Sequence, residues 1–291
     1  MAQRRRASHQ RHDQRQDQRK DQRQAGGREH RDAAPASSAK GTQFVYGRHA
    51  VTAALANPLR VVQRFLCLRE SIEEAALLLA EARATERPGR PEPIERRALE
   101  MLLPPDAVHQ GLALEAKPLA APELDDVLAA LPQEGEPHIL LLLDQVTDPH
   151  NVGAILRSAA AFAALAVIVP EHGAPPVTGT LAKAASGALE TVPLVRVTNL
   201  ARTIERLKTE GFWCVGLDSD APESLTAIDL PARIALALGA EGAGLRRLVR
   251  EQCDYLARLP VRGALHSLNV SNAAAVALYA LTQKAGTQRS K

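Results

Sequence analysis

The sequence contains few of the residues that build disulfide frameworks or metal centres. Its three cysteines, Cys67, Cys214 and Cys253, are widely spaced and form no C-x-x-C pair, which argues against disulfides and against a zinc site. The nine histidines are scattered along the chain, so we expect no bound metal. We interpret the cysteines as small apolar residues of the core.

Long apolar segments are also missing. No run approaches the roughly 18 uninterrupted apolar residues of a membrane-spanning helix, and no apolar signal-peptide segment follows the N-terminal arginines. We therefore expect a cytoplasmic protein that has no membrane partner. Aromatic residues make up only 3% of the chain and hydrophobic residues 45%, so aliphatic side chains must fill the cores.

The net charge of +3 is unevenly distributed along the chain. Residues 1–40 hold 11 Lys and Arg against 5 Asp and Glu, a net of +6, with seven Gln and no aromatic residue. Such a segment cannot bury enough apolar surface to fold, so we expect a disordered basic tail. Two interpretations stay open: an arm that contacts nucleic-acid phosphates, or a solvated extension.

The length of 291 residues suggests two folded domains beyond the tail, at about 150 residues each. Residues 41–117 mix short helical and strand-like segments and form a small domain, in which Ser71 and Glu74 are spaced as a capping box. Residues 118–136 are acidic and contain several prolines, and we interpret them as a linker. Residues 137–291 form the second domain.

Short apolar runs alternate with helical stretches in the second domain, which predicts an α/β fold with a parallel sheet covered on both faces. In such a domain the ligand binds beyond the carboxyl ends of the strands. The predicted strands are Ile139–Leu143, Ala166–Val169, Val192–Val195, Trp213–Leu217 and Ile234–Leu238.

The first polar segment of this domain, 144–158, follows the first predicted strand. Asp148 or Asn151 can cap the helix that comes next. Arg157 falls off the apolar face of that helix, where it is either a solvated charge or a phosphate ligand. Gly153 weakens the helix by about 1 kcal/mol relative to Ala, so we expect a close backbone approach there.

The second polar segment, Gly239-Ala240-Glu241-Gly242-Ala243-Gly244-Leu245, lies between a strand and a helix. Its spacing G-x-x-G-x-G differs from the dinucleotide-binding G-x-G-x-x-G, which disfavours a nucleotide-binding oxidoreductase. It is either a plain strand-to-helix turn or a loop whose backbone approaches a ligand.

The third polar segment, Ser267-Leu268-Asn269-Val270-Ser271, precedes the apolar run Ala273–Leu281. Small polar side chains there can cap a buried helix or present a ligand to the positive helix end.

In this order and spacing, Asn151 to Arg157, the glycine-rich segment and Ser-Leu-Asn-Val-Ser resemble the three motifs of the SpoU/TrmH family of RNA ribose 2′-O-methyltransferases. The resemblance covers residues 139–284. It extends to Tyr46–Val51 and His109–Gly111, which are similar to the RNA-binding accessory domain of the subgroup that methylates a guanosine in 23S ribosomal RNA.

The resemblance implies an α/β trefoil-knot methyltransferase domain at 137–291, an accessory RNA-binding domain at 41–117, S-adenosyl-L-methionine as cofactor and a homodimer. Val261 stands where the family usually has Met. The implied cofactor-binding residues are Leu238, Gly239, Gly242, Leu259, Val261 and Leu268. The implied catalytic residues are Arg157, Asn151, Glu241, Ser267 and Asn269.

Family proposals assign activation of the 2′-hydroxyl to the residue that matches Arg157. A guanidinium rarely accepts a proton, and a bidentate clamp on a phosphate fits its chemistry better. Two alternatives to a ribosomal RNA methyltransferase remain: a transfer-RNA 2′-O-methyltransferase, and a catalytically inert RNA-binding protein of the same fold.

Overall fold

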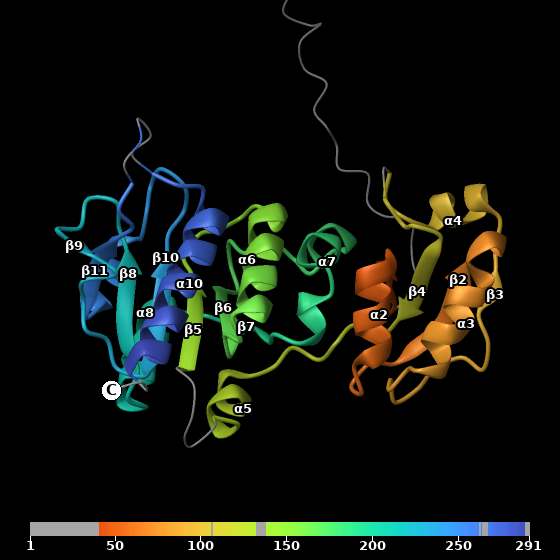
Figure 1. The fold of residues 1–291 in the computed structure, drawn as a ribbon, viewed down its shortest axis with the longest axis horizontal. Helices are drawn as coiled ribbons and strands as arrows, with labels where there is room; N and C mark the ends of the chain where they lie inside the picture. Colours follow the sequence, from red (N-terminus) through yellow and green to blue (C-terminus); the bar gives the residue numbers. More distant parts are fainter. Residues whose placement is uncertain (1–40, 106, 132–137, 262, 264–266, 289–291) are drawn as a thin grey trace, which may run out of the picture. The chain divides into compact units, whose positions relative to one another are not determined.

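The computed structural model describes residues 41–105, 107–131, 138–261, 263 and 267–288, which belong to one compact unit. The tail expected at 1–40 lies outside the described residues. Two β-sheets organise the described part of the chain (Figure 1).

The smaller sheet has the strand order β1-β4-β2-β3. Strand β4 pairs antiparallel with β1 and β2, while the short β3 is parallel to β2. Helices α2 and α3 contribute to the apolar cluster on one face, and α4 to a second cluster. The elements are β1 (Gln43–Tyr46), α2 (Arg48–Ala56), β2 (Val62–Cys67), the 3-10 turn η1 (Arg69–Ser71), α3 (Ile72–Ala80), β3 (Glu92–Pro93), α4 (Arg96–Leu102) and β4 (Leu112–Ala116).

The capping box predicted at Ser71 and Glu74 is wrong. Ser71 ends the η1 turn and makes no side-chain hydrogen bond to the start of α3. The Glu74 carboxylate instead pairs with the Arg48 guanidinium at 2.8 Å. A tertiary ion pair therefore takes the side chain that the local pattern assigned to a cap.

The larger sheet has the order β7-β6-β5-β10-β8-β11-β9, and all of its strand pairs are parallel. This confirms the predicted α/β class. Four of its strands agree with prediction to within one residue at each end, whereas β7 starts two residues late, after Pro193. The strands are β5 (His138–Leu143), β6 (Ala166–Pro170), β7 (Leu194–Val197), β8 (Trp213–Leu217), β9 (Glu223–Ser224), β10 (Arg233–Leu238) and β11 (Tyr255–Arg258).

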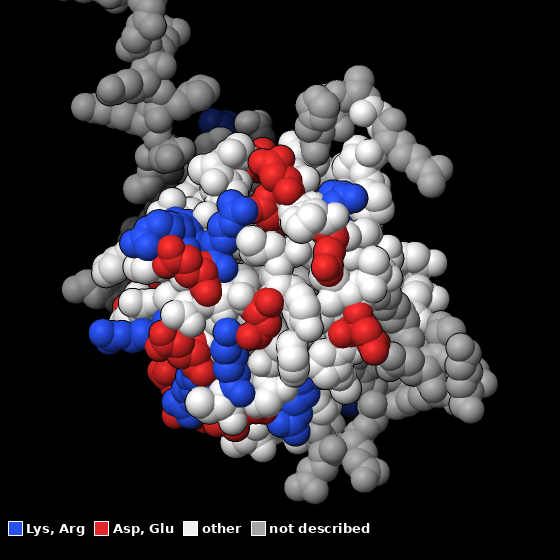
Figure 2. Space-filling model, turned by 90° about the vertical axis from the view of Figure 1, so that its left-hand side faces the viewer, with Lys and Arg blue, Asp and Glu red and all other residues white. Residues whose placement is uncertain are grey.

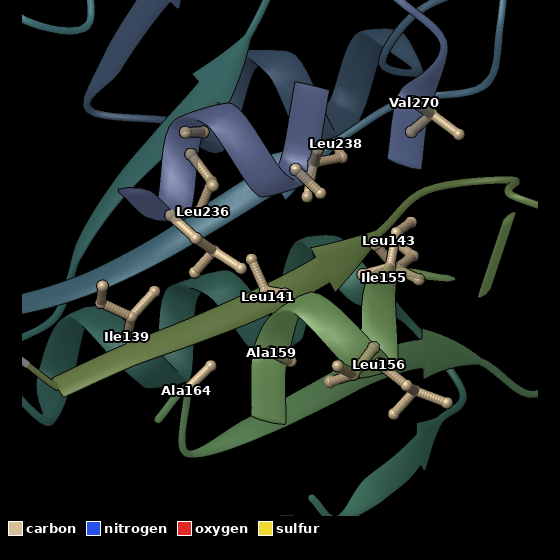
Figure 3. Packing of buried hydrophobic residues seen from close by; sticks show 14 of the residues in the cluster. Ile139, Leu141, Leu143, Ile155, Leu156, Ala159, Ala164, Leu236, Leu238 and Val270 are labelled. Carbon is tan, nitrogen blue, oxygen red and sulfur yellow. The ribbon is translucent and has the colours of Figure 1, made fainter. Parts of the chain in front are cut away.

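Both faces of this sheet are buried, as its continuous apolar strands require. Ile139, Leu141 and Leu143 of β5 join one apolar cluster with α6, α7 and α10, which Figure 3 shows from close by. Leu140 and Leu142 join the opposite cluster with α5, α8 and α9. The helices are α5 (Leu124–Ala129), α6 (Pro149–Ala161), α7 (Gly179–Ala185), α8 (Leu200–Thr209), α9 (Arg247–Gln252) and α10 (Val270–Gln288), with a 3-10 turn η2 (Ala188–Glu190).

Gly153 is the point where α6 comes closest to α7. A Cβ atom built on Gly153 would lie 2.4 Å from the Cβ of Ala184 and 2.8 Å from its carbonyl carbon. The expected close backbone approach is therefore confirmed, and its partner is another helix. Helix α6 stops at Ala161, because Ala163 takes a positive φ of 52°.

The knot implied by the family resemblance stays a prediction. The chain between β11 and α10 includes residues 262 and 264–266, which lie outside the described residues.

Cys67 and Cys214 are buried and Cys253 is partly buried, as expected of apolar core residues. A hydrogen bond to Cys253, 3.7 Å between the two sulfur atoms, together with burial, raises the pKa of the Cys214 thiol. Among the helices that the structure describes, none has the length and apolar character needed to cross a lipid bilayer.

A buried ion pair joins the loop between α2 and β2 to η2. Arg60 and Glu190 are 3% and 4% exposed, and the guanidinium approaches the carboxylate at 2.5 Å and 3.1 Å. Asn57 donates to the same carboxylate at 2.8 Å, and Arg60 also donates to the carbonyl of Lys117 at 2.8 Å. The charges are thus held by several hydrogen bonds, as burial demands.

We expect Arg60→Ala to lower the free energy of unfolding by about 3–5 kcal/mol, because it leaves the Glu190 carboxylate buried without its countercharge. Arg69→Ala is a matched control, since Arg69 and its partner Glu95 are 79% and 75% exposed, and exposed pairs contribute about 0–1 kcal/mol. Urea unfolding followed by circular dichroism measures both. Equal losses would contradict the assigned role of burial.

Candidate functional site

A cavity of about 440 Å³ opens beyond the carboxyl ends of β8 and β10, where an α/β sheet is expected to bind its ligand. Its walls come from three stretches: the loop after β8, the loop after β10, and the segment that leads from β11 into α10. The lining residues are Leu217–Asp220, Leu238–Leu245, Arg250, Leu259, Val261, Ser267–Val270 and Ala273.

The glycine-rich loop 239–245 folds back on itself as a tight hairpin. Ala240 donates its N–H to the carbonyl of Gly244 at 3.2 Å, and Gly244 donates to the carbonyl of Ala240 at 2.9 Å. A Cβ atom on Gly239 would lie 2.1 Å from the carbonyl carbon of Gly244. Gly242 takes a φ of +81°, which favours glycine. The hairpin therefore requires glycines, and it presents Glu241 at its turn.

A cluster of three polar side chains joins the three segments that the sequence singled out. Asn151 donates from Nδ2 to Oε1 of Glu241 at 3.1 Å. Asn269 donates from Nδ2 to the same oxygen at 2.5 Å and to Oδ1 of Asn151 at 3.1 Å. We call Asn151, Glu241 and Asn269 the polar cluster. Segments far apart in the chain thus meet at one edge of the cavity.

Helix caps position two members of the polar cluster. Asp148 accepts a hydrogen bond from the N–H of His150 at 2.9 Å, so it caps α6 and fixes the first turn that carries Asn151. Asn269 caps α10, because its Oδ1 accepts from the N–H of Ser271 at 2.9 Å and from the Ser271 hydroxyl at 2.6 Å. One amide therefore caps a helix with its oxygen and holds the polar cluster with its nitrogen.

The structure gathers ten of the eleven sequence-predicted site residues in this region. Ser267 and the six residues proposed for cofactor binding line the cavity together with Glu241 and Asn269, and Asn151 is bonded to both. Arg157 is the exception: it is exposed on α6, is absent from the cavity wall, and its side chain makes no hydrogen bond or ion pair with the part of the chain that the structure describes.

Four polar residues of the cavity wall were missed in the sequence: Asp218, Ser219, Asp220 and Arg250. The first three follow the predicted strand Trp213–Leu217, and that position at the carboxyl end of a strand was the signal that could have identified them. Asp218 pairs with Arg250 at 2.9 Å, so α9 is tied to the loop after β8.

The cavity combines acidic groups with exposed apolar side chains. Asp218, Asp220 and Glu241 supply the carboxylates, while Val261 and Leu268 are 40% and 38% exposed. This combination suits a ligand that carries positive charge and an apolar ring. Within the described residues no group of three or more His, Cys, Asp or Glu side chains is arranged to hold a metal ion.

Comparison with known proteins identifies relatives of both parts of the chain. The model of the SpoU rRNA Methylase family matches residues 138–279, and a model for RNA 2′-O ribose methyltransferase substrate binding matches residues 44–122.

Two relatives are 23S rRNA (guanosine-2′-O-)-methyltransferases named RlmB. That of Pseudomonas syringae pv. tomato is 43% identical over 250 residues, which cover 84% of this chain and 97% of the relative. That of Coxiella burnetii is 41% identical over 236 residues, which cover 81% and 93%. Among solved structures, the SpoU methyltransferase AviRb from Streptomyces viridochromogenes, in complex with the cofactor AdoMet, has a TM-score of 0.68 at 26% identity over 84% of this chain and 90% of AviRb.

Substitutions at Asn269 separate its two roles. We expect Asn269→Ala to lower the free energy of unfolding by about 1–2 kcal/mol, since it removes the cap and the amide donor. Asn269→Asp keeps an oxygen for the cap but places a carboxylate against Glu241, and adding Glu241→Gln should restore most of that loss. Urea unfolding distinguishes the variants. An Asn269→Asp loss that is unchanged by Glu241→Gln would disprove the contact.

Proposed function

The chain belongs to the SpoU rRNA methylase family, and we propose that it methylates the ribose 2′-hydroxyl of a guanosine in 23S ribosomal RNA, with S-adenosylmethionine as methyl donor. The observation that carries this proposal is the polar cluster at the edge of the cavity, built from the three motifs of the family. The names of the relatives support a ribosomal RNA substrate. A protein that acts on ribosomal RNA is expected to be located in the cytoplasm.

The residues of the cavity fit S-adenosylmethionine in size and chemistry. Its volume of about 440 Å³ lies in the usual range for ligand pockets of roughly 300–1,000 Å³. Leu238, Leu259, Val261 and Leu268 offer an apolar wall for adenine, and the backbone around Gly239 and Gly242 is not screened by side chains of its own. The nearby carboxylates suit the positive charges of a sulfonium and an ammonium.

When bound, S-adenosylmethionine would supply a methyl group: its carbon–sulfur bond would break as the ribose oxygen bonds the methyl carbon and releases its proton to solvent, leaving S-adenosylhomocysteine. The chain's own contribution is alignment of the ribose. We assign this to the polar cluster, which sets the cavity edge, and to Ser267, whose hydroxyl can hydrogen-bond within the cavity. These roles rest on position and family motif.

We assign Arg157 to the RNA. A guanidinium rarely accepts a proton, and its planar fork can bind a phosphate adjacent to the reacting ribose. On a helix rising about 1.5 Å per residue, Arg157 lies roughly 9 Å along the axis from Asn151. That separation agrees with its exclusion from the cavity wall of its own subunit.

We further propose that the chain forms a homodimer in which the Arg157 of each subunit reaches the cavity of the other subunit. Helix α10 buries Ala274, Ala277 and Leu278 but leaves Val276 and Tyr279 47% and 56% exposed. The Tyr279 ring meets Phe162, just past α6, edge to face with centroids 6.3 Å apart. An apolar face next to the site is thus available to a second copy.

Residues 41–117 are proposed as the accessory domain that chooses the RNA, with 118–136 as linker. The match to a substrate-binding family model supports this role. Charge alone does not: residues 41–136 hold 10 Lys and Arg against 15 Asp and Glu. Figure 2 shows a face of the other domain, the side with β9 and β11 in Figure 1, and basic and acidic residues are intermingled there as well. Local arginines must therefore supply the phosphate contacts.

The test is methyl transfer from S-adenosylmethionine to 23S ribosomal RNA from cells lacking the protein, with the modified ribose mapped. Transfer-RNA serves as the competing substrate, and methylation of it alone would overturn the ribosomal assignment.

Arg157→Ala and Arg157→Lys should reduce transfer at least about a hundredfold, as expected when an aligning contact is lost, while calorimetry shows unchanged cofactor affinity. Arg202→Ala, at an exposed position of α8, is the matched control.

Subunit mixing tests the shared site. Arg157→Ala and Asn269→Ala chains should each be inactive as homodimers. In a mixed dimer, one cavity combines the intact Asn269 of the first chain with the intact Arg157 of the second, so activity should return. Co-expression with two different affinity tags isolates this species. Mixed dimers without activity would show that Arg157 acts within its own subunit.

A further inference from the structure

Asp144 is a fully buried acidic residue that the proposed mechanism does not use. It follows β5 directly, has 0% exposed surface and does not line the cavity. A buried carboxylate requires hydrogen-bond partners and a countercharge, because it loses its hydration. Asp144 finds both in one residue, Arg246.

Arg246 stands where the glycine-rich loop 239–245 ends and α9 begins. Its backbone N–H donates to Oδ2 of Asp144 at 2.8 Å, and its side-chain Nε donates to Oδ1 at 2.7 Å. The Asp144 N–H donates in turn to the carbonyl of Leu238 at 2.8 Å, just before the loop. Asp144 therefore forms hydrogen bonds with the chain on both sides of the loop, at Leu238 and at Arg246. We call these two ends, held together by Asp144, the neck of the loop.

From these contacts we infer that Asp144, together with Arg246, is a positioning residue. It holds the glycine-rich loop in the position in which Glu241 accepts hydrogen bonds from Asn151 and Asn269. Closing the neck reduces the conformations open to the loop. The contacts are charge-assisted, which makes them strong and directional. The inference rests on the proposed function, since its effect on activity is transmitted through Glu241 and the cavity backbone.

The neighbouring Arg247 offers a contrast on the same helix. It pairs with Glu251 one turn later at 2.8 Å, with the two side chains 76% and 53% exposed. That pair belongs to the surface, and neither of its residues lines the cavity. Arg246 and Arg247 thus share a helix end and a charge, but only Arg246 is bonded to the neck of the loop.

The experiment compares Asp144→Asn, Arg246→Gln and the control Arg247→Gln, each in the full-length protein. Asparagine keeps the shape of Asp144 but turns an N–H₂ group toward one of the two Arg246 donors. We expect Asp144→Asn and Arg246→Gln to raise the KM for S-adenosylmethionine about tenfold or more and to lower kcat, with the KM for RNA unchanged. Arg247→Gln should match the wild type.

Two further readouts distinguish positioning from general stability. In a double-mutant cycle the effects of Asp144→Asn and Arg246→Gln on the cofactor KM should be less than additive, whereas Asp144→Asn and Arg247→Gln should add. Hydrogen exchange of the Ala240 and Gly244 amides, which close the hairpin, should accelerate in Asp144→Asn below its unfolding temperature while the β5 amides stay protected.

A lowered unfolding temperature with cofactor KM, kcat and loop exchange like those of Arg247→Gln would overturn the inference. If Asp144→Asn does not fold, Arg246→Gln decides, because its backbone N–H still donates to Asp144 and the glutamine amide can donate in place of Nε. A wild-type protein that transfers no methyl group would instead refute the proposed function, and loop exchange would still test Asp144.

Discussion

Parallel pairing of β5 with β10 is the constraint on which the rest of the site depends. Arg233 to Leu238 lie in register with His138 to Leu143, so two strands far apart in the sequence end side by side. The loops that follow them must then meet at one sheet edge. Asn151 and Glu241 come within hydrogen-bonding distance because of that register, and a shift of one residue would exchange the side chains of the strand between the two buried faces.

Small polar side chains organise this edge because each can serve two partners at short range. Asn269 has an acceptor and two donors on one rigid amide, so the start of α10 and the turn of the glycine-rich hairpin are fixed to each other. Glycines allow the hairpin to close on itself, with Gly239 in backbone contact with Gly244. The site is thus defined mainly by main-chain geometry, which amides and a buried carboxylate hold in place.

Residues whose environment is local could be predicted well from the sequence. Trp213–Leu217 is a strand with the predicted bounds, because a continuous apolar run favours a buried strand. β11, a short strand of mixed polarity, was missed because it carries no such run. The capping box at Ser71 failed because a distant arginine competes for Glu74.

The site shows the same division between local and tertiary information. The motifs identified ten residues that do lie together, but pattern alone could not show that Arg157 does not line the cavity of its own chain. It also could not reveal Asp218 or the role of Asp144, because their partners, Arg250 and Arg246, are defined only by the folded chain.

The buried pair of Arg60 and Glu190 has a consequence for how this chain can be divided or recombined. A cut in the connecting segment would leave an uncompensated arginine on one piece and an uncompensated carboxylate on the other. Each piece would then need a neutral residue in place of Arg60 or Glu190 to remain stably folded by itself. The same reasoning applies when domains are exchanged: a different N-terminal domain joined to the C-terminal part must supply a positively charged group to pair with Glu190. The buried charge of Glu190, rather than the length of the connecting segment, limits which N-terminal domains this chain can carry.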